Sequence, residues 1–382
     1  MPEAWNLRLL GHTDLDGHGD AMHVQLLGDL AYVGHMGEHG TSIVDVGDPA
    51  SMRVVGHVPA APNTHAHKVQ IVGDVMLTNR ELIPRHQPPH EAGLAIYSLA
   101  NPRRPERIAW WPCGGLGVHR MTWWEGTRAY VTAGDDAVDE QFLVVLDLAD
   151  PTRPTELGRW WLPGQAHGED RPWTEDMRVK MHHAIVRDGL AYAGWWDEGV
   201  VILDVRDPGA ISLVGRLDLG EDQARATHTF CPLPGRDVAV TTEERIPAGC
   251  VGVAPNTRLV DISDPSAPAV LSTFPVPEGD FCGRGGRFGP HNVHEPKPGY
   301  RIDGDTVYLT YFNGGLRVYD VSDATHPTEI GHYVPDAPDG QPAIQLNDVT
   351  VAEDGRIYVT DRLTGGLYVL EATAGLDAAR PG

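Results

Sequence analysis

The stretch MHHAIVRDGLAYAGWWDEGVVILDVRDP, which spans Met181 to Pro208, decides the fold. A histidine pair is followed by three short runs of β-branched and aromatic residues, and turns rich in Gly and Asp separate these runs. Such runs are typical of consecutive strands. The closing Asp-Pro dipeptide starts a turn and cannot continue a strand ladder. The stretch therefore predicts three strands followed by a tight turn.

The last strand of this unit recurs along the chain. Its copies are SIVDVGDP (42–49), LAIYSLANP (94–102), LVVLDLADP (143–151), RLVDISDP (258–265), LRVYDVSD (316–323) and LYVLEA (367–372). Self-similarity at a period of roughly 40–50 residues, with strands inside each unit, is typical of propeller blades. The sequence therefore predicts an all-β fold, a seven-bladed β-propeller.

The seven blades account for residues 1–382 as a single domain. Their predicted ranges are 22–58, 67–111, 119–162, 183–219, 228–276, 291–334, and 347–372 together with 5–13. The last unit has only three strands of its own. The segment LRLLGH (7–12) matches the outer strands MRVVGH (52–57) and TEIGH (328–332). We therefore expect the N-terminal strand to complete the last blade, which closes the ring and removes exposed strand edges.

These repeats resemble those of a known family. The pattern V-x-G-x-x-A-Y-V, followed by G-[LTV]-x-[IV]-[VL]-D-[VI]-x-D-P, is represented by Leu27–Val33 with Ile43–Pro49, and by Gly189–Ala193 with Val201–Pro208. It is similar to the pattern of the LVIVD-repeat β-propellers, and the similarity covers nearly the whole chain. The resemblance implies the architecture. That family has no single biochemical activity, so the resemblance implies neither a substrate nor a reaction.

The charge and the N-terminal sequence limit the partners and the location. With 53 acidic and 30 basic side chains, the formal net charge is −23, which argues against nucleic acid or an anionic membrane as partner. We expect a small-molecule substrate instead. The N-terminus lacks the basic and apolar regions of a signal peptide, and no apolar run is long enough to span a membrane.

The four cysteines form no CxxC pair and no regular framework. They are Cys113, Cys231, Cys250 and Cys282. We interpret them as reduced, inert thiols of a cytoplasmic protein.

The long connections are predicted to lie on one face of the propeller. They are the segments between blades, 163–181 and 277–290, and the loops between second and third strands, 81–92 and 244–256. The turns between first and second strands, such as Asp188-Gly189, are short. Long ordered loops are commonly functional, so this face is the expected location of a site.

Histidines open the first strand in five of the seven blades. These residues are His67, His119, His183, His228 and His291, while Met22 and Asn347 take the equivalent positions in the other two blades. Because first strands line the channel, the five rings converge on one axis, and we expect them to hold one divalent transition metal. Iron or manganese is favoured, and copper or zinc also suits imidazole ligands. The alternative is a structural role, as for a residue that any repeat copies. We assign that role to the outer-strand histidines His12, His57 and His332.

Further residues on the same face are candidates for other roles at the site. The predicted partners of the metal-bound histidines are Glu81, Glu243 and Asp348. The predicted catalytic residues are His182, His294, Arg245 and Glu198, and the predicted substrate-binding residues are Trp195, Trp196, Arg80 and Arg362. The alternatives are a solvated acidic rim for the carboxylates and pairing with that rim for the arginines.

Three functions are compatible with these features. The first is a metal-dependent oxidoreductase or oxygenase that acts on a small aromatic or carboxylate-bearing molecule at a non-haem centre. The second is a metal-dependent lyase that acts on an acidic sugar. The third is a non-catalytic scaffold whose long-loop face binds a protein.

Overall fold

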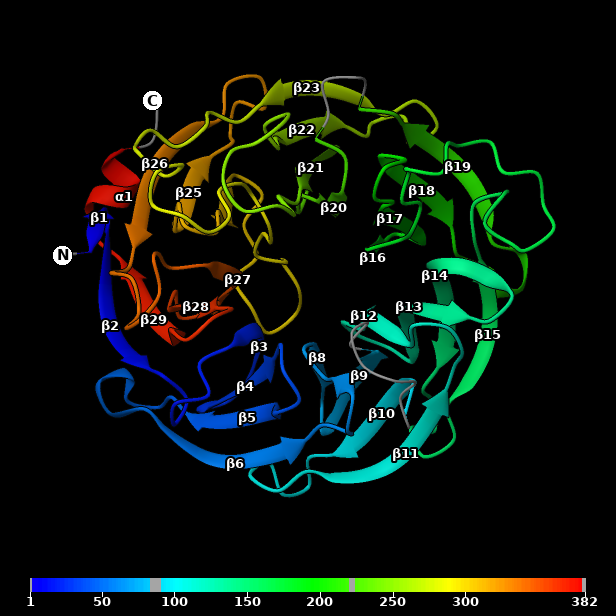
Figure 1. Cartoon of the computed structure of the whole chain (residues 1–382), viewed down its shortest axis with the longest axis horizontal. Coiled ribbons are helices and arrows are strands. Elements are labelled where there is room, and N and C mark those ends of the chain that lie inside the picture. The colour runs from blue at the N-terminus through cyan, green and yellow to red at the C-terminus, as the bar shows by residue number, and fades with distance from the viewer. Residues whose placement is uncertain (1, 83–90, 220–223, 380–382) are drawn as a thin grey trace.

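The computed structural model describes residues 2–82, 91–219 and 224–379. Within these ranges the chain forms seven antiparallel sheets, which Figure 1 shows arranged radially around a central channel. The predicted seven-bladed, all-β propeller is therefore confirmed. Residues 83–90 of the predicted loop 81–92 lie outside the described residues.

Each blade is one sheet, and the blades are numbered in chain order. Blade 1 contains β3 (Ala21–Leu27), β4 (Leu30–His35), β5 (Gly40–Asp45) and β6 (Arg53–Pro59). Blade 2 contains β7 (Thr64–His65), β8 (Val69–Val72), β9 (Val75–Leu82), β10 (Gly93–Ser98) and β11 (Glu106–Pro112). Blade 3 contains β12 (Val118–Thr122), β13 (Arg128–Asp135), β14 (Val138–Asp147) and β15 (Thr155–Trp160). Blade 4 contains β16 (His183–Arg187), β17 (Leu190–Gly194), β18 (Val200–Asp204) and β19 (Ser212–Leu217).

The remaining three blades follow the same plan. Blade 5 contains β20 (Thr227–Pro232), β21 (Val238–Glu243), β22 (Thr257–Asp261) and β23 (Ala269–Thr273). Blade 6 contains β24 (Thr306–Thr310), β25 (Leu316–Asp320), β26 (Thr328–Val334) and β1 (Glu3–Trp5). Blade 7 contains β27 (Leu346–Val351), β28 (Ile357–Asp361), β29 (Gly366–Ala372) and β2 (Leu7–Thr13). The helical segments are η1 (Pro49–Ser51), η2 (Pro208–Ala210) and α1 (Gly375–Ala378), and no helix in the described ranges is long and apolar enough to cross a membrane.

The repeated Asp-x-x-Asp-Pro motif builds the turn that leads from the third to the fourth strand. In blade 4, Asp204 accepts a hydrogen bond from the Arg206 N–H at 3.0 Å. Asp207 then accepts from the Gly209 N–H, also at 3.0 Å, and caps the short helix that begins at Pro208. Short Asp side chains suit both positions because they bond the backbone two residues ahead. The motif therefore specifies the turn directly.

Glycines on the outer strands lock each blade to the next. A Cβ on Gly158 would lie 1.8 Å from the Pro208 carbonyl oxygen, and one on Gly215 would lie 2.1 Å from the Pro265 carbonyl oxygen. These two outer strands thus touch the Asp-Pro turn of the following blade, and only glycine leaves room for that approach. The repeat pattern encodes the contact between blades as well as the blades themselves.

The hydrophobic core lies between adjacent sheets. Between blades 1 and 2, for example, Tyr32 and Ile43 pack with Val69 and Met76, and all four side chains are fully buried. Burying a side chain of this size stabilises the fold by about 1.5–3 kcal/mol. The alternating β-branched and aromatic residues of the repeat supply these contacts around the ring.

Cys250 and Cys282 form a disulfide, with their Cα atoms 5.6 Å apart. The expectation that all four cysteines are reduced thiols is therefore wrong for this pair. The two residues are separated by 32 positions, and only the meeting of two long loops brings them together. By chain entropy such a cross-link contributes roughly 3–4 kcal/mol. Cys113 and Cys231 are free, and burial raises the pKa of Cys113 to about 12, as expected for an inert thiol.

The N-terminus joins the last two blades. β2 pairs with β29 from Leu7, opposite Ala372, to Thr13, opposite Leu367, so the predicted closure of blade 7 is confirmed. β1 also pairs with β26 of blade 6, a contact that the repeat pattern does not predict. In Figure 1 both strands lie on the rim beside the red end of the chain.

A segment of blade 6 fills the channel. Residues 295–305 connect the bridge between Val293 and Leu309 to β24, where the other blades have short turns. The expectation that insertions lie on one face only is therefore wrong for this blade. Figure 1 shows the chain between β23 and β24 reaching into the channel beside β27. We call residues 295–300 the channel plug.

Charged and polar side chains of the channel plug find partners on several other blades. Glu295 forms a buried ion pair with Arg120 of blade 3. Lys297 donates to Gln25 of blade 1 and, at 3.4 Å, to Gln70 of blade 2. Buried charges are tolerated when they are paired in this way. The plug therefore ties distant blades together across the axis.

Removing residues 1–13 should destabilise the whole ring. The deletion exposes the edges of β29 and β26 and removes Leu7, which is only 3% exposed. We expect Tm to fall by about 10 °C or more in calorimetry, since the loss of several kcal/mol shifts a protein of this size by that amount. A synthetic peptide of residues 1–13, added in trans, should restore part of the loss. An unchanged Tm would contradict the closure.

The Arg120–Glu295 pair should be essential as a pair. Replacing Glu295 with Gln leaves the buried Arg120 guanidinium without its counter-charge and should cost about 3–5 kcal/mol in urea unfolding. The double variant Arg120→Met/Glu295→Met removes both charges and should be distinctly more stable than the single variant. If the Glu295→Gln variant were as stable as the wild type, the ion pair would make no contribution to the stability of the fold.

Candidate metal centre

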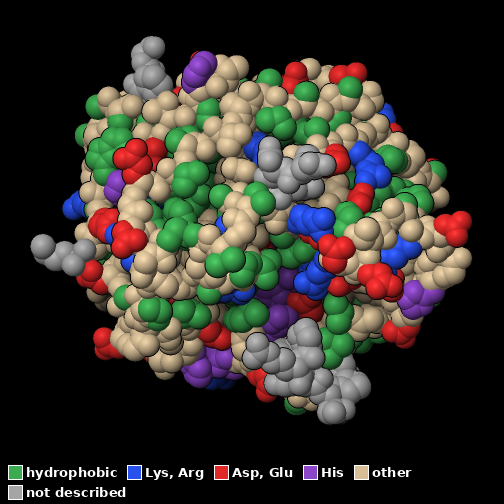
Figure 2. Space-filling model, turned by 45° about the horizontal axis from the view of Figure 1, so that its top comes forward, with side chains coloured by type: hydrophobic (Ala, Val, Ile, Leu, Met, Phe, Trp, Pro, Cys, Tyr) green, Lys and Arg blue, Asp and Glu red, His purple; other side chains and the backbone are tan. Residues whose placement is uncertain are grey.

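Seven histidines line the mouth of the channel in a continuous arc, and all but the partly buried His119 are fully buried. Ring centroids are 4.3, 5.1, 4.8, 3.5 and 4.3 Å apart on going from His65 through His67, His119, His182 and His228 to His291. His183 lies 5.0 Å from His182. Near the middle of Figure 2, histidine side chains form the floor of a hollow. The structure thus brings together the five predicted ligands and adds His65 and His182.

Bulges occur at the start of four inner strands, and two of them fall on histidines of the arc. The register of the first strand pair skips one residue in four blades, at Met22, His119, His228 and Asn347. A bulge lets two successive side chains face the same side. For this reason His119 joins the arc while its neighbour Arg120 reaches down to the channel plug.

Two histidines of the arc have Nδ1 fixed by an oxygen acceptor. The Nδ1–H of His119 donates to Glu81 Oε2 at 2.8 Å, and the Nδ1–H of His291 donates to the Asn347 carbonyl at 2.6 Å. Neither Nε2 has a hydrogen bond to a described residue, so each presents a lone pair. Metal-bound imidazoles are oriented by the same kind of partner.

Two further histidines between them also have Nδ1 in a hydrogen bond, with a hydroxyl as partner in one case and an imidazole in the other. His228 Nδ1 is bonded to Thr229 Oγ1 at 2.9 Å, and His182 Nδ1 is bonded to His183 Nδ1 at 2.8 Å. Within the described chain, Nε2 of His182 and of His228 is also without a hydrogen bond. In each of these four neighbouring imidazoles, Nδ1 is therefore hydrogen-bonded, and Nε2 is open, that is, without a hydrogen bond to a described residue.

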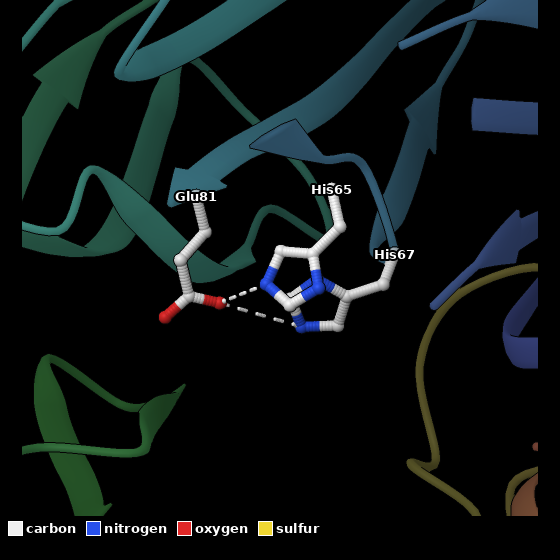
Figure 3. A group of neighbouring side chains, drawn as sticks. All are labelled: His65, His67 and Glu81. Atoms are coloured by element: carbon white, nitrogen blue, oxygen red, sulfur yellow. Dashed lines mark hydrogen bonds and ion pairs between the residues drawn. The ribbon is translucent and has the colours of Figure 1, made fainter. Parts of the chain in front are cut away.

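The blade 2 end of the arc has a different arrangement, which Figure 3 shows. One Glu81 oxygen, Oε2, lies 2.8 Å from His65 Nε2 and 3.9 Å from His67 Nε2. These three side chains are close enough to hold an ion. However, His67 Nδ1 accepts the Asn79 amide N–H at 3.2 Å, so the proton of neutral His67 is on Nε2 and faces Glu81. This end is therefore satisfied as a hydrogen-bonded imidazole–carboxylate cluster.

A second group of possible ligands lies at the other end of the arc. The ligand atoms of His228, His291 and Glu244 lie within 4.8 Å of one another. Glu244 Oε1 accepts from Arg287 at 2.8 Å and is 3.7 Å from His291 Nε2 and from Arg362. Both imidazoles of this group present an open Nε2. The group therefore has two nitrogen donors and one carboxylate available to a cation.

Burial keeps the four imidazoles that have an open nitrogen uncharged at neutral pH. It lowers the pKa of His182, His228 and His291 well below 6.5, and neighbouring positive groups lower it further. The pKa of His119 falls to about 4 for the same leading reason. Neutral imidazole is the form that binds metals, so these side chains need not release a proton to act as ligands.

Aromatic and basic side chains stand around the arc. The Trp196 ring stacks near His182 at 6.2 Å, and Lys180 Nζ lies 4.5 Å from the Trp196 centroid. Lys180 is 5% exposed and has no hydrogen bond or ion pair with any described residue. On the opposite side, Phe312 stacks on His291 at 4.8 Å, below Arg362. Of the predicted substrate-binding residues, Trp196 and Arg362 thus lie beside the arc.

Three predicted residues at or after the ends of second strands lie outside the arc. Glu243 is fully buried and pairs with Arg258 at 2.8 Å. Glu198 pairs with Arg216 on the outer strand of blade 4. Arg245 donates to two carbonyls of its own loop. Strand alternation explains the first case, because it directs Glu243 into the blade and Glu244 toward the channel.

Two predicted residues lie deeper in the channel. Both nitrogens of His294 bond backbone groups, Nε2 to the Arg301 carbonyl at 2.8 Å and Nδ1 to the Val351 N–H at 3.2 Å. Asp348 accepts from the Val24 N–H at 3.1 Å, and burial raises its pKa to about 6. Neither side chain contacts a histidine of the arc in the described structure.

Two others are held inside the blades. Trp195 is fully buried and donates to Gln165 at 3.1 Å. Arg80 is 2% exposed and donates to the Tyr97 hydroxyl at 2.7 Å. Their nearest sequence neighbours face the channel mouth instead, which again reflects the alternation along a strand.

Sequence reasoning missed three residues at the site. Glu244 was passed over for its neighbour Glu243, although both follow the same strand. Glu295 and Lys180 lie in long connections with no repeat partner, so no alignment of blades points to them. The sequence signal for Glu295 and Lys180 was a charged residue close to a predicted ligand histidine, in a stretch that is otherwise apolar or rich in proline.

Comparison with protein families identifies the repeat. Four segments match the LVIVD repeat, namely residues 18–59, 184–218, 255–275 and 301–334, which lie in blades 1, 4, 5 and 6. No curated protein matches the chain.

Solved structures resemble the fold at low sequence identity. The structure of U3-55K is 10% identical with a TM-score of 0.62, covering 97% of this chain and 100% of that one. A hypothetical selenium-binding protein from Sulfolobus tokodaii is 16% identical with a TM-score of 0.60, covering 88% and 83%. A protein from Lactobacillus plantarum is 14% identical with a TM-score of 0.59, covering 91% and 92%. At such identities the similarity concerns the fold alone.

Acid should destabilise the metal-free protein. Burial lowers the pKa of His119, His183 and His294 from 6.5 to about 4, so the unfolded chain binds more protons in this interval. Above pH 6.5 these histidines are neutral in both states and the full stability is present. As the pH falls from 6.5 toward 4, the free energy of unfolding decreases because only the unfolded chain takes up protons. At pH 5 each histidine costs up to about 2 kcal/mol. In chelator-treated protein, Tm should therefore fall steeply between pH 7 and 5.

The variant His294→Gln is the control for this pH dependence, since it removes one such group away from the arc. It should flatten the decline in Tm between pH 7 and 5. A Tm that is constant over this range would contradict the burial of neutral histidines.

Proposed function

The chain is an LVIVD-repeat β-propeller, and we propose that the histidine arc at the mouth of its channel holds a catalytic transition metal. The proposed reaction is oxidation or oxygenation of a small molecule at a non-haem centre. Because the repeat family has no single activity, the proposal rests on the chemistry of the site.

The proposal is carried by the open nitrogens of the arc. His228 and His291 each have a nitrogen within 4.8 Å of a Glu244 oxygen, and for His291 the Nε2 lies 3.7 Å from it, while the Nδ1 atoms of both rings are hydrogen-bonded. Two imidazoles and one carboxylate on one side of an ion form the donor set of non-haem iron oxygenases. His182, whose ring centroid is 3.5 Å from that of His228, is the candidate fourth donor.

The donor set suits iron or manganese better than a hard cation such as magnesium. Imidazole favours borderline metals, and a single carboxylate leaves coordination positions open to substrate. When bound, such an ion supplies Lewis acidity and one-electron redox chemistry.

The protein itself supplies orientation and a closed floor. Glu81 accepts the His119 Nδ1–H and thereby fixes which nitrogen of that ring faces the mouth. Beneath the arc, Glu295 lies 3.3 Å from His183 Nε2 and pairs with Arg120, so the channel plug separates the arc from the opposite face. A single open side favours the exclusion of water once a substrate covers the mouth.

The surroundings favour an aromatic or carboxylate-bearing substrate. Phe312 and Trp196 offer flat faces on two sides of the arc, and Arg362 and Lys180 offer positive charge. Arg362 shares its one carboxylate partner, Glu244, with Arg287, which leaves a positive charge in excess. Such groups bind a substrate carboxylate. The same charges suit an acidic sugar, the substrate of the alternative lyase reaction.

Replacing an arc histidine should remove the metal. We expect His228→Ala and His291→Ala to weaken binding by roughly 100-fold or more, and Glu81→Gln to weaken it by about 10-fold to 100-fold through the loss of the His119 partner. Metal content would be measured by mass spectrometry on untagged protein, with Kd from manganese titration. His12→Ala is the matched control, because this outer-strand ring bonds the Gly365 carbonyl far from the arc and should leave binding intact.

The alternatives give different outcomes in the same samples. A spectrum that changes between nitrogen and air supports redox chemistry, whereas a bound but redox-inert metal would favour the lyase. Wild-type protein that carries no metal and takes up neither iron nor manganese would overturn the proposal and leave the scaffold function.

A further inference from the structure

Two loops that flank the proposed metal site are joined by the disulfide. Residues 244–256 connect β21 to β22 and begin with Glu244, and residues 277–290 end immediately before His291. Cys250 in the first loop is bonded to Cys282 in the second, and both residues are exposed. The disulfide thus connects the loop that starts at one proposed ligand with the loop that ends at another.

The two loops are anchored unequally. In the second loop, Phe281 is 1% exposed, and Asn313 donates to the carbonyls of Phe281 and Gly285, each at 2.8 Å. The first loop has little apolar burial of its own, because Ile246, Val251 and Val253 are 43%, 75% and 49% exposed. A segment with few buried contacts opens at low cost unless it is tied to another. The second loop is therefore the support to which the disulfide fastens the first.

Few other contacts join the loops. Among the described residues, the polar contacts between them are the hydrogen bond from the Gly249 N–H to the Gly286 carbonyl, at 2.7 Å, and the Glu244–Arg287 ion pair. Arg245 bonds only carbonyls within the first loop. Contacts of this kind compete with water, whereas the covalent bond does not. Gly289 of the second loop also packs closely against Pro255 and Arg245 of the first, and the disulfide is the covalent tie between the two loops.

The disulfide acts on the metal site through Glu244. Its Oε1 is held 2.8 Å from Arg287, whose own N–H donates to Gln345 at 2.9 Å and so fixes the second loop to blade 7. In this position Glu244 lies 3.7 Å from His291 Nε2. The Glu244 N–H donates to the Ala226 carbonyl at 2.9 Å, so its backbone stays beside β21, and separation of the two loops frees only its side chain to turn away from the imidazoles. The blade 2 cluster around Glu81 has no covalent connection of this kind.

We propose that the Cys250–Cys282 disulfide is a redox switch for metal binding, in which the oxidised form holds Glu244 at the site and the reduced form releases it. The inference rests on the proposed function. A thiolate of a dithiol reductant attacks the exposed S–S bond, and the resulting mixed disulfide is resolved by the second thiolate. Two electrons and two protons convert the cystine into two cysteines, and the reductant leaves as its own disulfide.

The test compares manganese binding to the oxidised wild type and to the variant Cys250→Ser/Cys282→Ser, which needs no reductant in the titration. We expect Kd for manganese to rise at least tenfold in the variant at a temperature where circular dichroism shows it folded. Cys113→Ser, which keeps the disulfide, is the matched control and should bind as the wild type does. If the double variant fails to fold, wild type reduced on an immobilised phosphine and assayed for thiols takes its place.

A second comparison isolates the route through Glu244. In a Glu244→Gln background, removing the disulfide should change Kd less than twofold, because the switch then has nothing to release. A tenfold change that persists there would overturn the route, and equal Kd values in the oxidised and disulfide-free proteins would overturn the switch while leaving the metal site. Absence of metal from both forms would overturn the proposed function and, with it, this inference.

Discussion

The structure of the channel depends on the buried ion pair between Arg120 and Glu295. A propeller axis is bordered by the ends of seven sheets, and here that space is closed by one segment of blade 6. Arg120 from blade 3 neutralises the charge that this segment brings to the axis, and both side chains are more than nine-tenths buried. Removing one partner would leave an uncompensated charge in a medium of low polarity. The plug can therefore close the channel only because the two charges pair, and the closed channel in turn buries the histidines.

The burial of the histidines and the direction of their lone pairs have a common origin in the backbone. Bulges at the start of two inner strands place His119 and His228 in the channel, and hydrogen-bond partners at Nδ1 then decide which nitrogen carries the proton in His67, His119 and His291. The two ends of the arc differ for this reason alone. Where an amide N–H meets Nδ1, as at His67, the ring loses its free lone pair on the channel side. Where a carbonyl meets Nδ1, as at His291, the lone pair faces the mouth.

Much of this architecture could be predicted from the sequence, because a repeat reports its own structure several times. The Asp-Pro turns, the glycines of the outer strands and the N-terminal strand all follow from copies of one pattern, and so do the five ring histidines. An error of one position arose at Glu243, whose neighbour Glu244 faces the mouth, and of the predicted pair Trp195 and Trp196 only the second does so. On a strand, adjacent residues point to opposite sides, and a sequence pattern does not say on which residue a loop begins.

The remaining features could not be predicted because they depend on contacts between segments that are not equivalent. Glu295 meets Arg120 across 175 positions of sequence, and no other blade carries a plug with which it could be aligned. Cys250 and Cys282 likewise lie in insertions that occur once each. A repeat pattern describes what the blades share, whereas the channel mouth is built from what distinguishes them.

The closure of the ring by the N-terminal strand has a consequence for the synthesis of the protein. β2 leaves the ribosome well before its partner β29, because Thr13 and Gly366 are far apart in the sequence. At ordinary translation rates the two are separated by on the order of tens of seconds. During that time Leu7–Thr13 has no strand to pair with, and the blades that have already folded lack their final neighbour. Until β29 is made, the apolar edge of β2 must not pair with other chains. Chaperones that bind the nascent protein therefore have a defined segment to protect.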